Sequence, residues 1–256
     1  IQSIADSLCA QASIQKIMGN GSTSTYRLRA KAFENSLTTL LNLNEDERHP
    51  IRGYIHARTN FYKNAAGISA AHVQINPSTL CIGDTIWNIH SSSIDYSKND
   101  LTVNKFSISH DKQHLIIDGR ATDKDADSLQ VLLQDININY ILNLVNFHSV
   151  EFSGMASGRA CISACFTKQP IAHAHLTVND FRFDNGRMGT LHADASLNTT
   201  LKQIDINATA VDTDDRRTLI NGYVSPQRSD IKLDITAQRT RVEFLESFCS
   251  SFMRDI

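Results

Sequence analysis

The sequence predicts an all-β fold with a few short helices, built around a long, curved antiparallel sheet. Apolar and polar residues alternate in short runs along most of the chain, for example over Ile204–Ala210 and Ile231–Ile235. On a strand, such alternation places all the apolar side chains on one face. The runs follow one another about every ten residues, which is the spacing of strands joined by hairpins rather than of βαβ units. We therefore expect one apolar and one solvated face, and look for function on the apolar one.

Residues 1–48 are predicted to be the end of a preceding repeat that contains short helices. The apolar residues of 1–20 recur at helical spacing, which favours a first helix. A strand is expected over Tyr26–Ala32, where basic and apolar residues alternate, and Asn35–Leu43 is typical of a second short helix.

Two repeats of strands are expected to follow, over residues 49–139 and 140–256. Apolar runs with helical spacing, Tyr140–Phe147 and Val242–Phe252, stand at the start and near the end of the second repeat. Clusters of turn residues separate the strands of both repeats. They include Asn76–Pro77, Ser97–Asp100, His110–Lys112, Asp184–Gly186 and Asp212–Asp215.

Glycine recurs inside the expected strands, as in Ile117–Gly119, Phe152–Gly154 and Leu219–Gly222. A glycine within a strand usually marks a bulge, a bend or the close approach of another backbone. The sequence therefore predicts a sheet that curves repeatedly along its length.

Composition excludes several classes of protein. Hydrophobic residues make up 41% of the 256 residues, which is enough for a folded core. The formal net charge of −2 is scattered along the chain and argues against nucleic acid as a partner. No run approaches the ~20 apolar residues of a membrane-spanning helix. The chain begins at Ile1 without a leader pattern, so we expect a fragment of a longer protein.

The five cysteines do not predict a disulfide framework. Their number is odd and small for a chain of this length. Cys161 and Cys165 are four residues apart, so on one strand they would share a face but lie roughly 13 Å apart, too far to bond. We expect buried or half-buried thiols.

Candidates for catalysis or metal binding are few. His173 and His175 share one face of an expected strand, but no third ligand is evident, and the apolar residues between them predict that both imidazoles face solvent. His110 and His114 flank a turn. The acidic stretch Asp123–Asp127 lacks the central glycine and the terminal glutamate of a calcium loop and is typical of a solvated turn. With no nucleophile elbow or phosphate-binding loop, we expect no enzyme activity, metal or cofactor.

The order and spacing of several segments resemble the AsmA-like and TamB family of very large bacterial envelope proteins, particularly those of Bacteroidetes. The segments that carry the resemblance are Asp84–Ile89, Leu101–Val103, Phe106–Ile108, Gln113–Gly119, Phe152–Gly158, Pro170–Leu191 and Leu219–Tyr223. The resemblance covers roughly residues 50 to 256.

The resemblance implies a long β-sheet folded lengthwise into a taco-like groove with an apolar interior. Members of the family are anchored in the inner membrane, cross the periplasm and resemble bridges that carry phospholipid to the outer membrane. An older view gives them a role in outer-membrane protein assembly and secretion with a barrel partner. For this chain the resemblance implies a non-enzymatic periplasmic segment, with its anchor outside the sequence and phospholipid as its partner.

The candidate groove residues are those that alternate most strictly with polar neighbours: Ile204, Ile206, Leu233, Ile235, Leu191 and Leu197. An open groove would hold acyl chains on these side chains, since each buried methylene contributes about 0.8 kcal/mol. The same pattern also fits a closed β-sandwich that serves interaction or adhesion through its loops, with these residues in a dry core. The sequence leaves both interpretations open.

Overall fold

The protein is almost entirely β-strand in the part that the computed structural model describes, namely residues 13–18, 24–32, 51–63, 69–82, 85–140, 152–183, 186–225, 228 and 230–237. The chain packs as two compact units. Unit 1 comprises Ile1–Val131 with Ile162–Lys168, and unit 2 comprises Leu132–Cys161 with Gln169–Ile256. The predicted all-β fold class is confirmed. The predicted boundaries of the two repeats stay a prediction.

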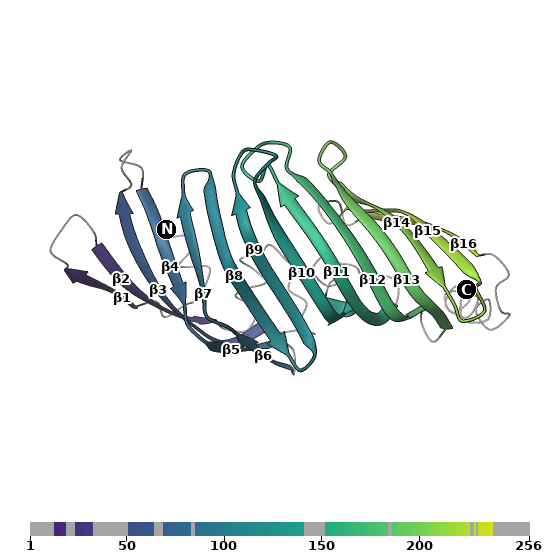
Figure 1. Ribbon diagram of the computed structural model, residues 1–256, viewed down its shortest axis with the longest axis horizontal. Coiled ribbons are helices and arrows are strands. Elements are labelled where there is room, and N and C mark those ends of the chain that lie inside the picture. The colour runs from purple at the N-terminus through teal and green to yellow at the C-terminus, as the bar shows by residue number, and fades with distance from the viewer. Residues whose placement is uncertain are drawn as a thin grey trace. The chain divides into compact units, whose positions relative to one another are not determined.

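Nine of the described strands belong to unit 1 (Figure 1). They are β1 (Ser13–Met18), β2 (Ser24–Ala32), β3 (Ile51–Lys63), β4 (Ser69–Ile75), β5 (Ser78–Ile82), β6 (Thr85–Ile89), β7 (Ser92–Ser97), β8 (Asp100–His110) and β9 (Gln113–Ala121). Their hydrogen-bonded order is β1-β2-β3-β4-β7-β8-β9, with β5 and β6 off this path. Neighbours pair antiparallel, as hairpin connections require.

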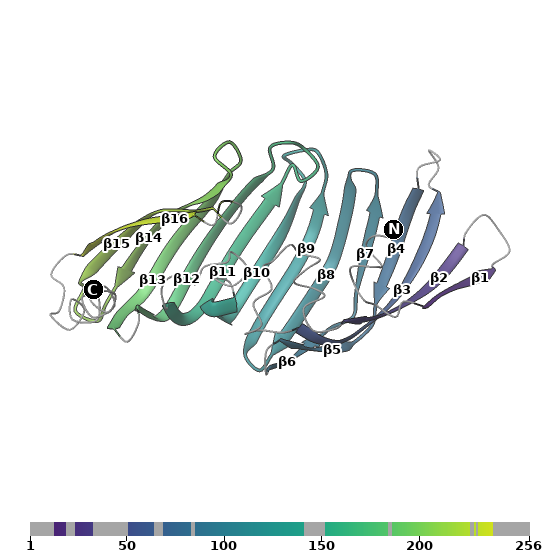
Figure 2. The same cartoon turned by 180° about the vertical axis from the view of Figure 1, so that it is seen from behind.

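The short strands β5 and β6 pair with the same neighbouring strands, β3 and β8, as β4 and β7 do. Strand β3 pairs with β4 at one end and with β5 at the other, and β8 likewise pairs with both β7 and β6. The predicted turn at Asn76–Pro77 is therefore wrong, because the chain bends there without reversing. Pro77 has no N–H and so cannot donate to a neighbouring strand. The Ser78 hydroxyl accepts a hydrogen bond from the His56 N–H at 2.9 Å. Figure 2 shows β5 and β6 turned away from β4 and β7 at this bend.

One strand pair in each unit bends at a register shift that lies opposite a glycine. In unit 1, β8 has a register shift between Val103 and Phe106, with Lys105 at φ 49°, opposite Gly119 of β9 at φ 115°. In unit 2, β12 has a register shift after Val178, opposite Gly189 at φ 88°. A Cβ at Gly119 would lie 2.4 Å from the carbonyl oxygen of Ser128, so this position requires glycine. Glycine thus marks bends inside the strands, as predicted.

Unit 2 is a hairpin meander of six further strands that follows β10 (Ser128–Asn137). They are β11 (Phe152–Ser163), β12 (Ile171–Phe183), β13 (Gly186–Asn198), β14 (Gln203–Val211), β15 (Arg217–Ser225) and β16 (Asp230–Ala237). The hydrogen-bonded order follows the chain from β10 to β16, and both β10 and β11 contribute residues to each unit. Within the described residues, β16 pairs only with β15, so the sheet does not close on itself.

One of the predicted helices is wrong, and most of the others lie outside the described residues. Residues 13–18, assigned to a first helix, form strand β1, whose residues Ile14 and Ile17 pair with Leu28 and Thr25 of β2. Apolar residues three apart, such as Ile14 and Ile17, do not by themselves establish a helical period, and pairing with β2 decides for the strand. Residues 138–140 are helical, whereas 141–147, Asn35–Leu43 and Val242–Phe252 lie outside the described part. Among described residues, no helix has the length and hydropathy to cross a membrane.

Candidate functional site

The aliphatic residues of unit 2 form regular rows across four strands. Cross-strand pairs connect β13 to β14, β14 to β15 and β15 to β16 in uninterrupted antiparallel register. Directly paired residues lie on the same side of a sheet, so the pairs join into rows. The first row is Leu197, Ile204, Val224 and Ile231; the second is Ala195, Ile206, Gly222 and Leu233; the third is Ala193, Ala208, Ile220 and Ile235. These rows, with Leu191 on the same side of β13, are called the apolar face below.

All six predicted groove residues lie on the apolar face. They are Leu191 and Leu197 of β13, Ile204 and Ile206 of β14, and Leu233 and Ile235 of β16. Leu191 is buried, with 6% of its surface exposed, whereas Leu197 is 37% exposed. The other four are half-buried, and three of them pack against the buried core of unit 2. The structure therefore brings the six together on one side of the sheet.

Aromatic side chains fill the core next to the apolar face. The rings of Phe152 and Phe181 stack with their centroids 5.5 Å apart, and the Phe183 ring lies 5.6 Å from that of Phe152. Val178, which is 1% exposed, pairs with Leu191 and joins this cluster to the apolar face. The aromatic cluster and the apolar face thus form one continuous core in unit 2.

Short side chains separate the large ones on the apolar face. Ile206 of β14 and Leu233 of β16 are both paired with Gly222 of β15, which lies between them. A Cβ added at Gly222 would lie 1.9 Å from the carbonyl oxygen of Lys232, so backbone packing excludes a side chain there. Ile206 and Leu233 therefore flank a position where the bare backbone of β15 faces the apolar side.

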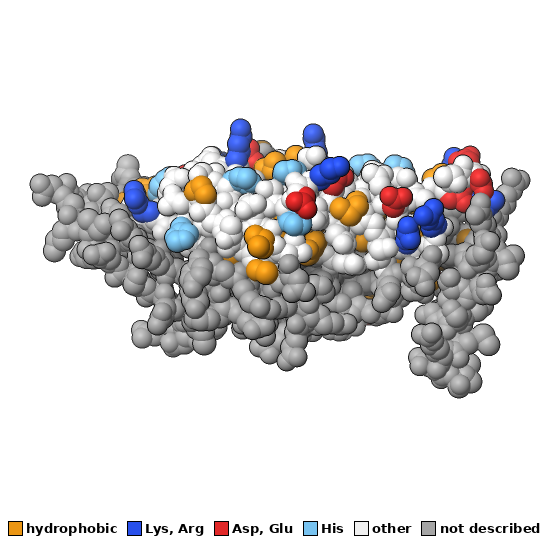
Figure 3. Space-filling model, turned by 90° about the horizontal axis from the view of Figure 1, so that it is seen from below, with side chains coloured by type: hydrophobic (Ala, Val, Ile, Leu, Met, Phe, Trp, Pro, Cys, Tyr) orange, Lys and Arg blue, Asp and Glu red, His pale blue; other side chains and the backbone are white. Residues whose placement is uncertain are grey.

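The opposite face of unit 2 is polar. His175 of β12 and Asp194 of β13 are paired, and their Nδ1 and Oδ1 atoms lie 2.7 Å apart with both side chains largely exposed. His192 lies beside Thr177 on the same face, with Nδ1 and Oγ1 3.3 Å apart. Seen from below in Figure 3, the described surface carries histidines, charged groups of both signs and small, separate hydrophobic groups. The two faces of unit 2 thus differ as the alternation predicts.

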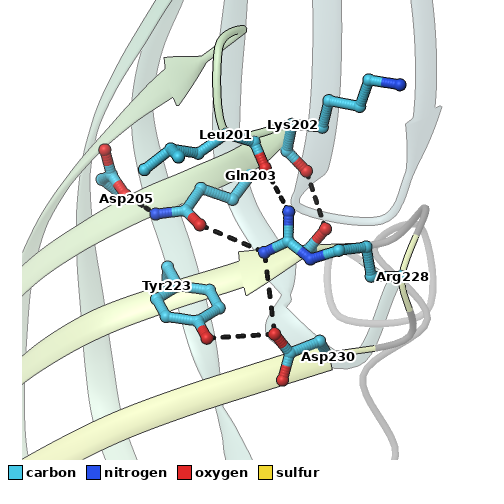
Figure 4. Close-up of polar contacts among 8 residues, drawn as sticks. Leu201, Lys202, Gln203, Asp205, Tyr223, Arg228 and Asp230 are labelled. Carbon is cyan, nitrogen blue, oxygen red and sulfur yellow. Dashed lines mark hydrogen bonds and ion pairs between the residues drawn. The ribbon is translucent and has the colours of Figure 1, made fainter.

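A polar cluster connects two hairpin ends at one edge of the sheet of unit 2 (Figure 4). Arg228 donates to the carbonyl oxygen of Leu201 and to Oε1 of Gln203, the latter at 3.2 Å, and its guanidinium lies 3.6 Å from the Asp230 carboxylate. The buried hydroxyl of Ser225 donates to the Lys202 carbonyl oxygen at 2.7 Å. The β13–β14 connection is thereby attached to the segment between β15 and β16. We call these residues the edge cluster.

Hydrogen bonds in and next to the edge cluster shift two pKa values. Gln203 and Asn198 donate to the Asp205 carboxylate at 2.6 and 3.0 Å, which lowers the pKa of Asp205. The Tyr223 hydroxyl donates to the Asp230 carboxylate at 3.0 Å, and this bond raises the pKa of Tyr223. Both shifts stabilise the charge states that Asp205 and Tyr223 have at neutral pH.

Unit 1 also has one apolar and one polar face. Ile75, Leu80 and Ile89 form its buried cluster. On the other face, Arg120 donates to both oxygens of the Asp100 carboxylate, at 2.9 and 2.7 Å. This pairing lowers the pKa of Asp100 and raises the pKa of Arg120. Unit 1 is thus amphipathic in the same way as unit 2, with a smaller buried cluster among the described residues.

The candidate metal ligands of β12 lie on a polar face, whereas His110 lies on the same side of β8 as Phe106 and Ile108. His173 and His175 are exposed on the polar face of β12, as predicted. His110 Nδ1 lies 2.9 Å from the carbonyl oxygen of Ile86, and its ring lies 5.7 Å from the Trp87 ring. Among the residues that the structure describes, no group of three or more His, Cys, Asp or Glu side chains is arranged to hold a metal ion.

The Asp123–Asp127 stretch forms an exposed connection between β9 and β10. Thr122 closes it by donating to the Asp127 carboxylate at 2.8 Å. Cys81, Cys161 and Cys165 are half-buried, whereas Cys9 and Cys249 lie outside the described part. Cys165 follows the end of β11, so it does not share a strand with Cys161.

Comparison of the chain with known protein families, with curated proteins and with solved structures finds no match. The candidate site therefore depends on the geometry of the chain itself. The sequence interpretation missed the aromatic cluster and the edge cluster. Alternation in Phe181–Phe183 could have indicated the first, whereas the second joins segments whose proximity follows only from the strand register.

Proposed function

We propose that the apolar face of unit 2 binds the acyl chains of phospholipids and shields them from water, without catalysing a reaction. The observation that supports this most is the set of rows across β13 to β16, in which five large aliphatic side chains stay half-buried: Ile204, Ile206, Ile231, Leu233 and Ile235. A sheet with one such face favours a ligand that is apolar, extended and chemically inert.

The dimensions of the rows suit one acyl chain. Four strands at about 4.8 Å per step span about 14 Å from the first strand axis to the last. The hydrocarbon core of a bilayer is about 30 Å thick, so each leaflet contributes chains about half as long. A chain laid along a row would contact Ile206 and Leu233 and cross the bare backbone at Gly222. Each methylene removed from water would contribute about 0.8 kcal/mol.

The sequence resemblance extends this proposal to the cell envelope. We propose that the chain is a segment of a periplasmic protein of Gram-negative bacteria, anchored to the inner membrane by a part outside this sequence. In this role it would support phospholipid transport between the two membranes, outer-membrane biogenesis and protein secretion, with an outer-membrane barrel as a possible partner of the whole protein.

A closed interaction or adhesion module is the alternative. The burial of Val178 and Leu191 favours it, because a dry core would also bury such residues. Against it, the strands of unit 2 follow one another in a single open order, and the described part contains no second sheet facing them.

The direct test is extraction of the purified chain with organic solvent, followed by mass spectrometry for phospholipid. We expect phospholipid in the wild-type extract and its loss from the Ile206→Asp/Leu233→Asp variant, because two carboxylates on the apolar face oppose acyl burial. A photo-crosslinking residue in place of Ile206 should form an adduct with the lipid.

The matched control introduces two carboxylates on the polar face of the same strands. Asn207→Asp with Thr236→Asp changes exposed positions of β14 and β16 and should leave the lipid content unchanged. Circular dichroism must show a folded sheet in both variants. Lipid retained by the folded Ile206→Asp/Leu233→Asp variant would exclude the apolar face as the binding surface.

A further inference from the structure

Strand β16 is an edge strand in the described part of the protein. It pairs with β15 on one side, through Gly222 and Leu233 at its middle, and no described strand pairs with its other side. An edge with unpaired backbone groups is a template for another strand. The side chains of Lys232 and Asp234 are 65% and 72% exposed on the polar face of this edge.

The sequence of β16 is self-complementary about its centre. Residues 231 to 235 read Ile-Lys-Leu-Asp-Ile. If a second copy of the strand lies antiparallel to the first with Leu233 opposite Leu233, then Ile231 faces Ile235 and Lys232 faces Asp234. Both cross-strand charge pairs are then opposite in sign, and the aliphatic residues of both copies lie on one side. Such directly opposed pairs stabilise a sheet.

Neighbouring registers lack this complementarity. A shift by one residue places apolar residues opposite polar ones, because side chains alternate between faces. A shift by two residues places either Lys232 opposite Lys232 or Asp234 opposite Asp234, and like charges directly opposite destabilise a strand pair. One register is therefore favoured by both the apolar and the charged residues.

The backbone of β16 is oriented to allow this register. The Lys232 carbonyl oxygen lies where a Cβ of Gly222 would be, so it points toward β15. Backbone groups alternate in direction along an antiparallel strand, so those of Ile231, Leu233 and Ile235 point toward the free side. These are the residues that would exchange hydrogen bonds with the second copy.

We propose that two copies of this chain associate through β16, in an antiparallel strand pair whose two-fold axis passes between the two Leu233 residues. The pairing is isologous, as expected of a symmetric dimer. It extends the apolar face of unit 2 from one copy into the other through Leu233, and it requires no lipid. It is thus separate from the lipid-binding proposal and is tested on lipid-free protein.

The test is the oligomeric state of the lipid-free chain by sedimentation velocity over a range of concentrations. We expect a concentration-dependent dimer for the wild type. Lys232→Asp and Asp234→Lys each replace two attractive pairs by two repulsive ones. Each should therefore raise the dissociation constant of the dimer by about tenfold or more. The basis is ~0.2–1 kcal/mol for each attractive pair lost and for each repulsive pair gained.

Restoring complementarity should restore the dimer. The exchange variant Lys232→Asp/Asp234→Lys should dimerise like the wild type. An equimolar mixture of the two single variants should also dimerise, because both charged positions of one chain are then acidic and face the two basic positions of the other. The mixture keeps the test valid if the exchange variant folds poorly. Lys202→Asp, an exposed change of the same charge outside β16, should have no effect.

Three results would overturn the proposal. The first is a wild type that stays monomeric at all concentrations. The second is a dimer that persists in both folded single variants, since another surface would then hold it. The third is a mixture of folded single variants that remains monomeric.

Discussion

At the scale of single residues, the pair formed by Asp100 and Arg120 is the clearest electrostatic contact of unit 1. Two hydrogen bonds, at 2.9 and 2.7 Å, join the start of β8 to the end of β9, where Arg120 lies opposite Thr102. Bidentate pairs of arginine and carboxylate are more directional than single ion pairs. Arg120 holds the pKa of Asp100 below its ordinary value of 3.8.

This lowered pKa predicts a pH dependence of stability. A carboxyl whose pKa is lower in the folded chain stabilises the fold above its unfolded pKa, and this contribution is lost as pH falls through the folded pKa. We expect Asp100→Asn to lower the melting temperature at pH 7. The difference from the wild type should shrink as pH falls below 3.8 and vanish once Asp100 is protonated.

Thermal melts followed by circular dichroism across this pH range check the prediction. Asp125→Asn is the matched control, because it removes the same charge from an exposed connection. A difference between Asp100→Asn and the wild type that stays constant down to full protonation would show that the pair with Arg120 is not its cause.

At the scale of elements, the edge cluster fixes the two hairpin ends beside the apolar face. Ser225 is 1% exposed, and its hydroxyl donates to the carbonyl oxygen of Lys202 in the neighbouring connection. A hydrogen bond of this kind contributes about 0.5–1.5 kcal/mol to stability. We expect Ser225→Ala to lower the free energy of unfolding by this amount, and to accelerate amide exchange around Lys202 more than in β12.

Urea unfolding and hydrogen exchange measure the two effects. Thr200→Ala in the same connection is the control, since Thr200 is exposed. Exchange that increases equally in all strands of unit 2 would show a global effect of Ser225→Ala and no local attachment of the hairpin ends.

How far the sequence predicts these elements depends on whether local pattern or pairing decides them. Alternation was sufficient for β14 and β16, whose apolar residues share one face. It was insufficient at Asn76–Pro77, where typical turn residues bend a strand because β3 pairs on both sides of them. Lys105 at positive φ follows from the bulge opposite Gly119, since lysine has no local preference for that conformation.

In the candidate site, too, local alternation predicts some features and strand pairing decides the others. The common face of Ile204, Ile206 and Leu233 follows from a period of two residues. The position of Gly222 between Ile206 and Leu233 depends on the register of three strands. This register cannot be predicted from the sequence alone. The two units nevertheless share a local device, a bulge opposite a glycine of positive φ.

At the scale of the whole molecule, lipid binding and stability are linked. A ligand that binds only the folded chain raises the free energy of unfolding by about 2.7 kcal/mol at a concentration one hundred times its dissociation constant. We expect a single-chain lysophospholipid, added below its micelle concentration, to raise the melting temperature of the wild type. The Asn207→Asp/Thr236→Asp control should respond equally, and the Ile206→Asp/Leu233→Asp variant should not respond.

The same melts separate the open face from a closed core, because the two arrangements respond differently when no lipid is present. On an open face, the carboxylates of Ile206→Asp and Leu233→Asp reach water, so the lipid-free variant should melt within a few degrees of the wild type. In a dry core, each buried carboxylate would cost several kcal/mol, and a chain of ordinary stability would not fold. A folded variant without a lipid response favours the phospholipid-binding face. An unfolded variant, together with a wild type that ignores lysophospholipid, favours the closed interaction module.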